Sequence, residues 1–305
     1  MQHWFIGVAG FLLLLLAACG PAPSDEKQII IFHAGSVSRP IREVSDAFMK
    51  LHPEINILHE AAGSVESARK ITDLKRTCDV FVSADVSLIE KMLWPHYASQ
   101  WFGFAGNALG IAFTPESRYS SIINASNWHE ILLHPDVNFA RSDPQADPCG
   151  YRTLFVWQLA EKLYKKPGLY KSLLLKDQRL VRPKETDLLV LLQTHNADYI
   201  FIYRSLAIQH NLSFIELPDS INLSQPRLAE FYQNASVRLR GLSPGDSIEQ
   251  HGQAILYGVT IPLNAPHPQL AQEYLRFLLD KSHGLSTFKA AGHALPDSIL
   301  VFPAQ

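Results

Sequence analysis

Two serines in this sequence lie between a predicted strand and a predicted helix, and both could donate hydrogen bonds to an anion. Ser36 follows a glycine after the apolar run 29–32, and Ser64 follows a glycine after the alternating segment 54–60. A helix that starts at a serine offers a hydroxyl and unpaired backbone N–H groups, and its dipole adds positive potential. Two such points aimed at one spot would hold a small oxyanion. The alternative is that both serines are ordinary N-caps.

Three further residues could face the same spot from later segments. Asp147 precedes a proline and a helical pattern, so it is also a good N-cap. Glu185 lies in a turn that begins another helix, which leaves backbone amides available there. Tyr203 ends the apolar strand 199–203 and could present its hydroxyl at the strand end, or it could be a core aromatic residue.

The elements around these residues alternate between strand length and helix length. Residues 29–92 follow a β-α-β-α-β order, and a second such series follows from residue 108. This order predicts an α/β fold with mostly parallel sheets that are flanked by helices. We expect two lobes with two crossing strands as the hinge, one lobe from 28–108 with 259–305 and the other from 109–258. Ligands of such sheets bind beyond the carboxyl ends of strands, in a cleft. The glycine-rich stretch 239–252 suits an exposed connection.

Composition excludes several classes of function. The chain has 305 residues, a charged fraction of 18% and a formal net charge of −2, without a cluster of Lys and Arg, so it lacks the footprint of a nucleic-acid-binding protein. It has no nucleophile elbow, zinc-protease motif, Walker loop or dinucleotide fingerprint. We therefore predict no enzyme activity and no cofactor. A hydrolase that uses Ser36 or Ser64 is the alternative from another class.

The N-terminus is predicted to be a targeting segment. An apolar block over 11–18 is too short to span a bilayer and fits a signal peptide of residues 1–18. The sequence before Cys19 resembles a bacterial lipobox, so we expect lipidation of Cys19 and a tether over 19–27. An uncleaved anchor would also hold the protein outside the cytoplasm. The other cysteines, Cys78 and Cys149, could form a disulfide or remain two buried thiols.

The chain resembles the molybdate/tungstate-binding proteins of ABC importers, in the branch first associated with archaeal tungstate uptake. The resemblance runs from about residue 29 to the C-terminus. It is carried by residues 32–36, 60–66, 83–85, 127–132, 147–152, 182–188, 209–212 and 257–262.

This resemblance implies a type II periplasmic-binding-protein fold that closes on a tetrahedral oxyanion. It implies hydroxyl and amide donors at Ser36 and Ser64, a donor at Tyr203 in the second lobe, and backbone or carboxylate contacts at Asp147 and Glu185. It also implies an importer permease as partner, a membrane-anchored location outside the cytoplasm, and a monomer. Another tetrahedral oxyanion, such as sulfate or phosphate, is the alternative ligand.

One position departs from that family. Its members use two carboxylates that approach the metal, and Asp147 matches the first. The second should precede Tyr203, where this chain has Ile202. Either Asp147 acts alone on the metal, or the ion stays tetrahedral and is held by hydrogen bonds. With one carboxylate, we expect weaker or less tungsten-selective binding.

Overall fold

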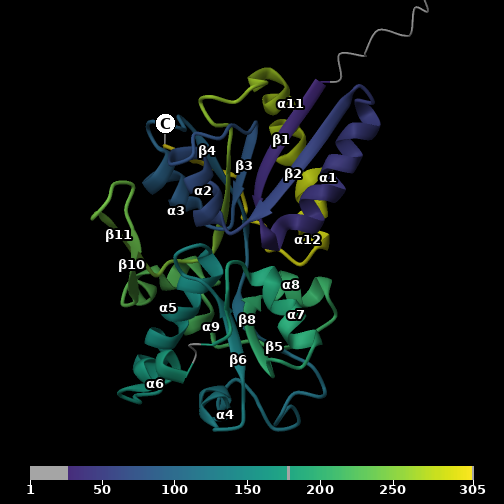
Figure 1. The fold of residues 1–305 in the computed structure, drawn as a ribbon. Coiled ribbons are helices and arrows are strands. Elements are labelled where there is room, and N and C mark those ends of the chain that lie inside the picture. Colours follow the sequence, from purple (N-terminus) through teal and green to yellow (C-terminus); the bar gives the residue numbers. More distant parts are fainter. Residues whose placement is uncertain (1–26, 177–178, 304–305) are drawn as a thin grey trace, which may run out of the picture.

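The computed structural model describes residues 27–176 and 179–303. The predicted signal peptide, Cys19 and the tether up to residue 26 lie outside the described residues. The described chain forms two α/β lobes, one above the other in Figure 1. The two-lobed α/β organisation predicted from the sequence is therefore confirmed.

The first lobe is built on a six-stranded sheet. Strands β1, β2 and β3 pair in parallel, whereas β12 and β13 join it through antiparallel pairs with β3 and β4. The strands, in spatial order, are β13 (Leu300–Phe302), β4 (Trp101–Gly106), β12 (Leu256–Thr260), β3 (Val80–Ser83), β1 (Lys27–Ala34) and β2 (Ile55–Ala62).

The second lobe has a five-stranded sheet of the same mixed kind. Strand β6 pairs in parallel with β7 and β8, and β5 pairs antiparallel with β8 and β9. The spatial order is β7 (Val181–Arg182), β6 (Phe139–Ser142), β8 (Tyr199–Tyr203), β5 (Leu109–Phe113) and β9 (Ser213–Ile215). The expectation of mostly parallel sheets thus needs correction, because β12 and β13 in the first sheet and β5 in the second run opposite to the other strands.

Helices flank both sheets. In the first lobe they are α1 (Ser38–Leu51), α2 (Ser64–Thr72), α3 (Val86–Leu88), α11 (Pro268–Leu278) and α12 (Gly284–Ala290), with the turns η1 (Gly35–Val37) and η2 (Ile89–Leu93). In the second they are α4 (Trp128–Leu133), α5 (Pro148–Leu163), α6 (Leu169–Lys176), α7 (Leu188–Gln193), α8 (Arg204–Gln209), α9 (Asp219–Asn222) and α10 (Ala229–Tyr232), with η3 (Glu185–Asp187) and η4 (Pro226–Leu228).

Apolar spacing explains why these helices lie on the sheets. Helix α1 buries Ile41, Val44 and Phe48, which fall on one face at intervals of three and four residues. Its last residue is Leu51, shortly before Pro53, because the residue before a proline is disfavoured in the helical conformation. Strand β1, which lies between β3 and the edge strand β2, is buried from Ile31 onward, which matches its continuous apolar run.

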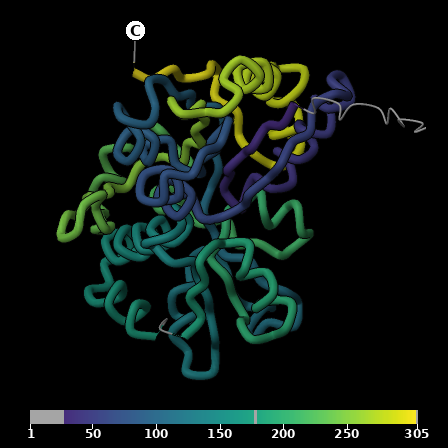
Figure 2. The backbone as a smooth tube through the Cα atoms, turned by 45° about the horizontal axis from the view of Figure 1, so that its top comes forward, coloured from purple at the N-terminus to yellow at the C-terminus, as the bar shows by residue number. Residues whose placement is uncertain are grey.

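The chain crosses between the lobes twice. Asn107 and Ala108 join β4 of the first sheet to β5 of the second, at the place that the sequence indicates. The return leads into β12, which begins at Leu256 and belongs to the first sheet, so it precedes the expected return at 259 by three residues. Figure 2 shows the yellow C-terminal part of the chain in the same lobe as the purple N-terminal part, where α11 and α12 pack against α1.

The stretch expected to be an exposed connection is instead a hairpin. Strands β10 (Ser236–Arg240) and β11 (Ser247–His251) pair antiparallel and lie at the left side of Figure 1. Only Val237 and Leu239 of β10 and Ile248 of β11 are apolar, so the alternating pattern that identifies a strand is short and weak here. Gly245 in the connecting turn has a φ of +87°, which favours glycine.

Cys78 and Cys149 are both buried free thiols, so they do not form the disulfide that the sequence left open.

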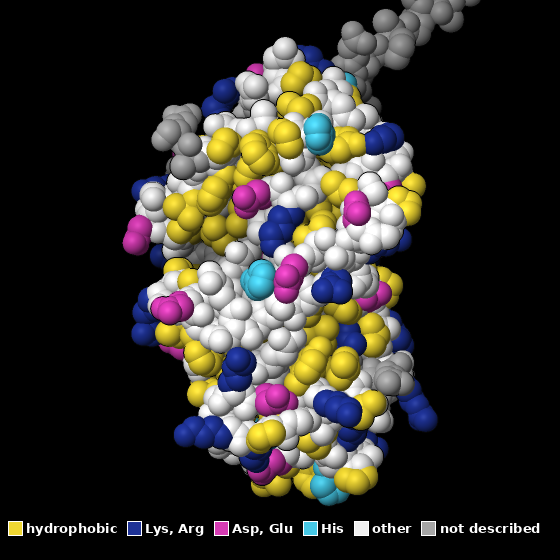
Figure 3. All heavy atoms as spheres, turned by 90° about the vertical axis from the view of Figure 1, so that its left-hand side faces the viewer, with side chains coloured by type: hydrophobic (Ala, Val, Ile, Leu, Met, Phe, Trp, Pro, Cys, Tyr) yellow, Lys and Arg dark blue, Asp and Glu magenta, His cyan; other side chains and the backbone are white. Residues whose placement is uncertain are grey.

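Within the described ranges, no helix has the length and apolar character needed to cross a bilayer. On the face that carries the hairpin, Lys and Arg side chains are interspersed with Asp and Glu, without a broad basic area (Figure 3).

The two lobes touch closely at Gly63, which stands directly before α2. The backbone N–H of Glu66 in the first lobe donates to the carbonyl oxygen of Ala146 in the second, at 3.1 Å. A Cβ atom added at Gly63 would lie 2.3 Å from that same carbonyl oxygen. Glycine is therefore required at residue 63 for this close approach of the lobes.

Candidate functional site

Neither of the two serines caps its own helix. Ser36 lies inside the turn η1, and Ser64 is the first residue of α2, whose N-cap is Gly63. Instead, the hydroxyl oxygen of Ser36 accepts a hydrogen bond from the Tyr257 hydroxyl at 3.0 Å, and that of Ser64 accepts one from the Ala84 backbone N–H at 2.9 Å. The alternative of two ordinary N-caps is therefore wrong, since both side chains are held by other parts of the first lobe.

Asp147 and Glu185 bring two carboxylates together in the second lobe. Asp147 caps α5, as predicted, because its Oδ1 accepts from the Cys149 backbone N–H at 3.3 Å. Its Oδ2 accepts from the backbone N–H of Glu185 at 2.9 Å, so the two turns are tied to each other. Both side chains are buried, at 1% and 0% exposure.

The electrostatic state of this pair is unusual. Burial, together with the neighbouring Glu185 carboxylate, raises the pKa of Asp147 well above its ordinary value. Apart from the neighbouring Asp147 carboxyl, with which it can share a proton, neither carboxylate oxygen of Glu185 has a hydrogen-bond partner in the described part of the chain. Buried polar atoms are rarely left unpaired, so these oxygens require an explanation. A bound ligand that the carboxylates contact would provide it.

Two glycines of the first lobe face these carboxylates. A Cβ atom added at Gly35 would lie 3.3 Å from Glu185 Oε1, and one added at Gly63 would lie 3.1 Å from the Cβ of Asp147. Since Gly35 and Gly63 directly precede the two serines, the serine turns of one lobe meet the carboxylate turns of the other. The convergence of four turns expected from the sequence is present in the structure.

Tyr203 joins the same place from the end of β8. Its hydroxyl accepts a hydrogen bond from Arg152 Nη1 at 2.8 Å, and the same nitrogen donates to the Ala84 carbonyl oxygen at 2.7 Å. Because the Ala84 N–H donates to Ser64, this guanidinium links Tyr203 in the second lobe to Ser64 in the first. The positive charge of Arg152 is paired with Asp85 at 3.1 Å, and both are buried.

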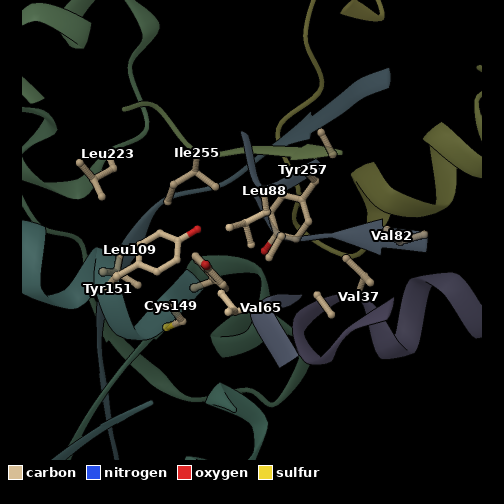
Figure 4. Close-up of a cluster of buried hydrophobic side chains, with 14 of the residues drawn as sticks. Val37, Val65, Val82, Leu88, Leu109, Cys149, Tyr151, Leu223, Ile255 and Tyr257 are labelled. Atoms are coloured by element: carbon tan, nitrogen blue, oxygen red, sulfur yellow. The ribbon is translucent and has the colours of Figure 1, made fainter. Parts of the chain in front are cut away.

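The five predicted residues are therefore buried together at one interlobe point. Ser36, Ser64, Asp147, Glu185 and Tyr203 are each at most 1% exposed. Figure 4 shows part of the apolar surroundings, where Val37 and Val65, the neighbours of the two serines, lie in one cluster with Tyr151 and Tyr257. Because the site is closed to solvent, a solute can enter only when the lobes separate.

Ile202 lies on the other side of its strand. It is buried in a separate apolar cluster with Leu188 and Leu192, whereas Tyr203 belongs to the large interlobe cluster. Alternate residues of a strand point to opposite faces, so Ile202 packs as a core residue, away from the carboxylates. The expectation that it provides no ligand agrees with this placement.

Three residues of the site were not selected from the sequence as site residues. They are Arg152, Asp85 and Tyr257, which hold Tyr203, Arg152 and Ser36 respectively. Each occurs within a stretch that carries the family resemblance, but the partners are far apart in the chain. Tyr257 and Ser36, for example, are separated by 221 positions, so spacing alone gives no signal for the contact.

Comparison with known families gives a match over most of the chain. Residues 29–293 match the model of the bacterial extracellular solute-binding proteins. An uncharacterized solute-binding protein of Petrotoga mobilis is 48% identical over 253 residues, covering 83% of this chain and 79% of that protein. The molybdate/tungstate-binding protein WtpA of Pyrococcus abyssi is 39% identical over 300 residues, covering 89% of this chain and 86% of that protein.

Solved structures share the fold at low sequence identity. The periplasmic molybdate-binding protein of Azotobacter vinelandii superposes with a TM-score of 0.65 at 16% identity, over 88% of this chain and 100% of that one. The sulfate-binding protein SubI of Mycobacterium tuberculosis gives 0.63 at 12% identity, over 89% and 88%. These neighbours confirm the type II periplasmic-binding-protein fold. The family match and the sequence relatives together show that this chain belongs to the bacterial extracellular solute-binding protein family, whose members act outside the cytoplasm.

Proposed function

We propose that this protein captures molybdate or tungstate between its lobes and delivers the ion to an ABC importer. The observation that carries the proposal is the closed interlobe site, in which three hydroxyls and two carboxylates are buried at one point. Relatives of similar length that bear the name molybdate/tungstate-binding protein, from Pyrococcus abyssi and Thermococcus kodakarensis, support it.

The hydroxyls suit the oxygens of the ion. Ser36, Ser64 and Tyr203 each already accept a hydrogen bond from another protein group, so each retains its own hydrogen to donate. Hydrogen bonds to charged groups contribute about 1.5–3 kcal/mol each, so neutral donors can hold a dianion without a full countercharge.

The carboxylates suit the metal of the ion. A carboxylate beside a dianion is repelled unless it is protonated or bonds to the central atom. We propose that Asp147 contacts the metal and that Glu185, whose oxygens have no partner in the described residues besides the Asp147 carboxyl, is the second carboxylate that Ile202 cannot provide. Sulfate offers no such central atom, which makes it the weaker alternative. Phosphate can bring a proton, so it remains the competing ligand that binding measurements must include.

The proposal also covers the oligomeric state, the absence of catalysis and the membrane anchor. We infer that the protein is a monomer without catalytic activity or a resident cofactor, because its role is to bind and release the ion. We also infer lipidation at Cys19, which would keep the protein at the membrane beside the importer permease. The lipobox-like sequence before Cys19 supports this anchoring.

The first test is direct binding. Calorimetric titration should show that molybdate and tungstate bind, whereas sulfate and phosphate bind at least about a hundredfold more weakly. Ser64→Ala should weaken binding about ten- to a hundredfold, because one hydrogen bond to a charged ligand is lost. Ser45→Ala is the control, since Ser45 is equally buried in the same lobe but bonds to Tyr274 and Ile41. Preference for sulfate, or an unchanged affinity of the Ser64 variant, would contradict the proposal.

The second test concerns closure. Gly63→Ala places a methyl group against the Ala146 carbonyl oxygen, so the lobes should fail to reach the closed arrangement. We expect affinity to fall about ten- to a hundredfold and the ligand-induced decrease in the radius of gyration, measured by small-angle scattering, to shrink. Gly106→Ala is the control because a methyl group there meets only ordinary contacts, the nearest at 3.5 Å. Full compaction of the Gly63 variant would be inconsistent with this account.

The third test uses pH. The raised pKa of Asp147 means that the folded protein holds this proton more tightly than the unfolded chain, whose aspartates titrate near about 3.9. In the ligand-free protein, the free energy of unfolding should therefore fall as pH rises above that value, until the raised pKa is passed. Asp147→Asn should reduce this slope and greatly weaken ion binding. Chemical unfolding from pH 4 to 8 measures the slope, and an identical slope in the variant would show that Asp147 is not the group responsible.

A further inference from the structure

A chain of hydrogen bonds connects the first interlobe crossing to Ser36. Asn107 lies in that crossing, between β4 and β5, and is only 6% exposed. Its side-chain nitrogen donates to the Tyr257 hydroxyl at 3.1 Å, and Tyr257 in turn contacts Ser36 at 3.0 Å. The three residues come from the crossing, from β12 and from η1. No part of the proposed ligand set includes Asn107 or Tyr257.

The donor-to-acceptor direction of this series of hydrogen bonds is fixed at Asn107. The side-chain oxygen of Asn107 accepts from two backbone N–H groups, those of Ala108 at 3.0 Å and Ser205 at 3.3 Å. If the amide were reversed, its NH2 group would face these two donors, so the observed orientation is the one that satisfies all groups. The nitrogen must then point to Tyr257 and to the Ser205 hydroxyl, which it meets at 2.8 Å.

The Tyr257 hydroxyl is oriented in the same way, by the hydrogen bond that it accepts. Its oxygen accepts from Asn107, so its hydrogen is available for Ser36. Burial raises the pKa of Tyr257 far above its ordinary value, so the phenol keeps that hydrogen. The oxygen of Ser36 thus acts as an acceptor toward Tyr257. Within residues 27–176 and 179–303, Ser36 Oγ has no other side-chain or backbone partner, so its own hydrogen is free to point into the site.

We propose that Tyr257, held by Asn107, is a positioning residue that directs the Ser36 hydroxyl hydrogen toward the bound oxyanion. This rests on the proposed function and adds to it a determinant of ligand class, because a hydroxyl fixed as a donor favours a bare oxygen over a protonated one. Asn107 contacts Ser205 in the second lobe and Tyr257 in the first, so the orientation also depends on the geometry of the crossing.

Tyr257→Phe tests the proposal, and the chain supplies a matched control. Tyr274 is likewise a fully buried tyrosine of the first lobe whose hydroxyl pairs with a serine, Ser45, at 2.8 Å. We expect Tyr257→Phe to raise the dissociation constant for molybdate about tenfold, and Tyr274→Phe to leave it within about twofold, although both remove one buried hydrogen bond. Unchanged affinity of the Tyr257 variant, in a wild type that binds molybdate, would overturn the proposal.

A second comparison separates positioning from general support of the fold. In a Ser36→Ala background, Tyr257→Phe should have no further effect on affinity, because the group that it orients is gone. An undiminished tenfold effect in that background would show that Tyr257 acts by another route, and would also overturn the proposal.

The same panel distinguishes a failure of the proposed function. If the wild type binds sulfate or phosphate in place of molybdate and tungstate, the proposed ligand is wrong, and the Tyr257 and Tyr274 variants are compared with the ion that binds. The positioning role then stands if the tenfold difference and its loss in the Ser36→Ala background appear with that ion, and it falls if they do not. A wild type that binds none of the four ions would overturn both.

Discussion

The confinement of two carboxylates between the lobes is the constraint on which the rest of this structure depends. Asp147 and Glu185 are both withdrawn from water, and the nearby positive charge of Arg152 is already paired with Asp85. Burying two neighbouring carboxylates costs free energy unless they share a proton or bond to an electron-poor atom. A metal oxyanion would supply that atom, and the glycines at 35 and 63 allow the opposite lobe to approach closely enough to hold it.

Around the carboxylates, the protein arranges hydroxyls whose oxygens are already occupied. Tyr257, the Ala84 N–H and Arg152 donate to Ser36, Ser64 and Tyr203 respectively. This leaves three hydrogens directed by partners outside the proposed ligand shell, from both lobes. A site preorganised in this way loses little entropy on binding, because the donors need not be ordered when the ion arrives. Closure of the lobes then completes the shell and excludes water.

Much of the fold could be predicted from the sequence because its signals are local. Apolar runs mark β1 and β8, the spacing in α1 marks its buried face, and the Asp147-Pro148 pair marks the start of α5. The hairpin β10–β11 was missed because its strands are short and carry only three apolar residues, Val237, Leu239 and Ile248. The five candidate site residues were proposed from turns and resemblance, whereas the residues that hold them in place were not. Contacts such as Asn107 with Tyr257, 150 positions apart, are created only by the topology.

The central claim is that the metal oxide lies at the meeting point of residues 36, 64, 147, 185 and 203. Crystals grown with tungstate and measured at the tungsten absorption edge would locate the heavy atom without reference to any assigned role. We predict one strong anomalous peak between the lobes, with carboxylate oxygens of Asp147 and Glu185 bonded to the metal and the three hydroxyls at its oxygens. A peak elsewhere, or an ion between the lobes whose tungsten has no carboxylate ligand, would contradict this account.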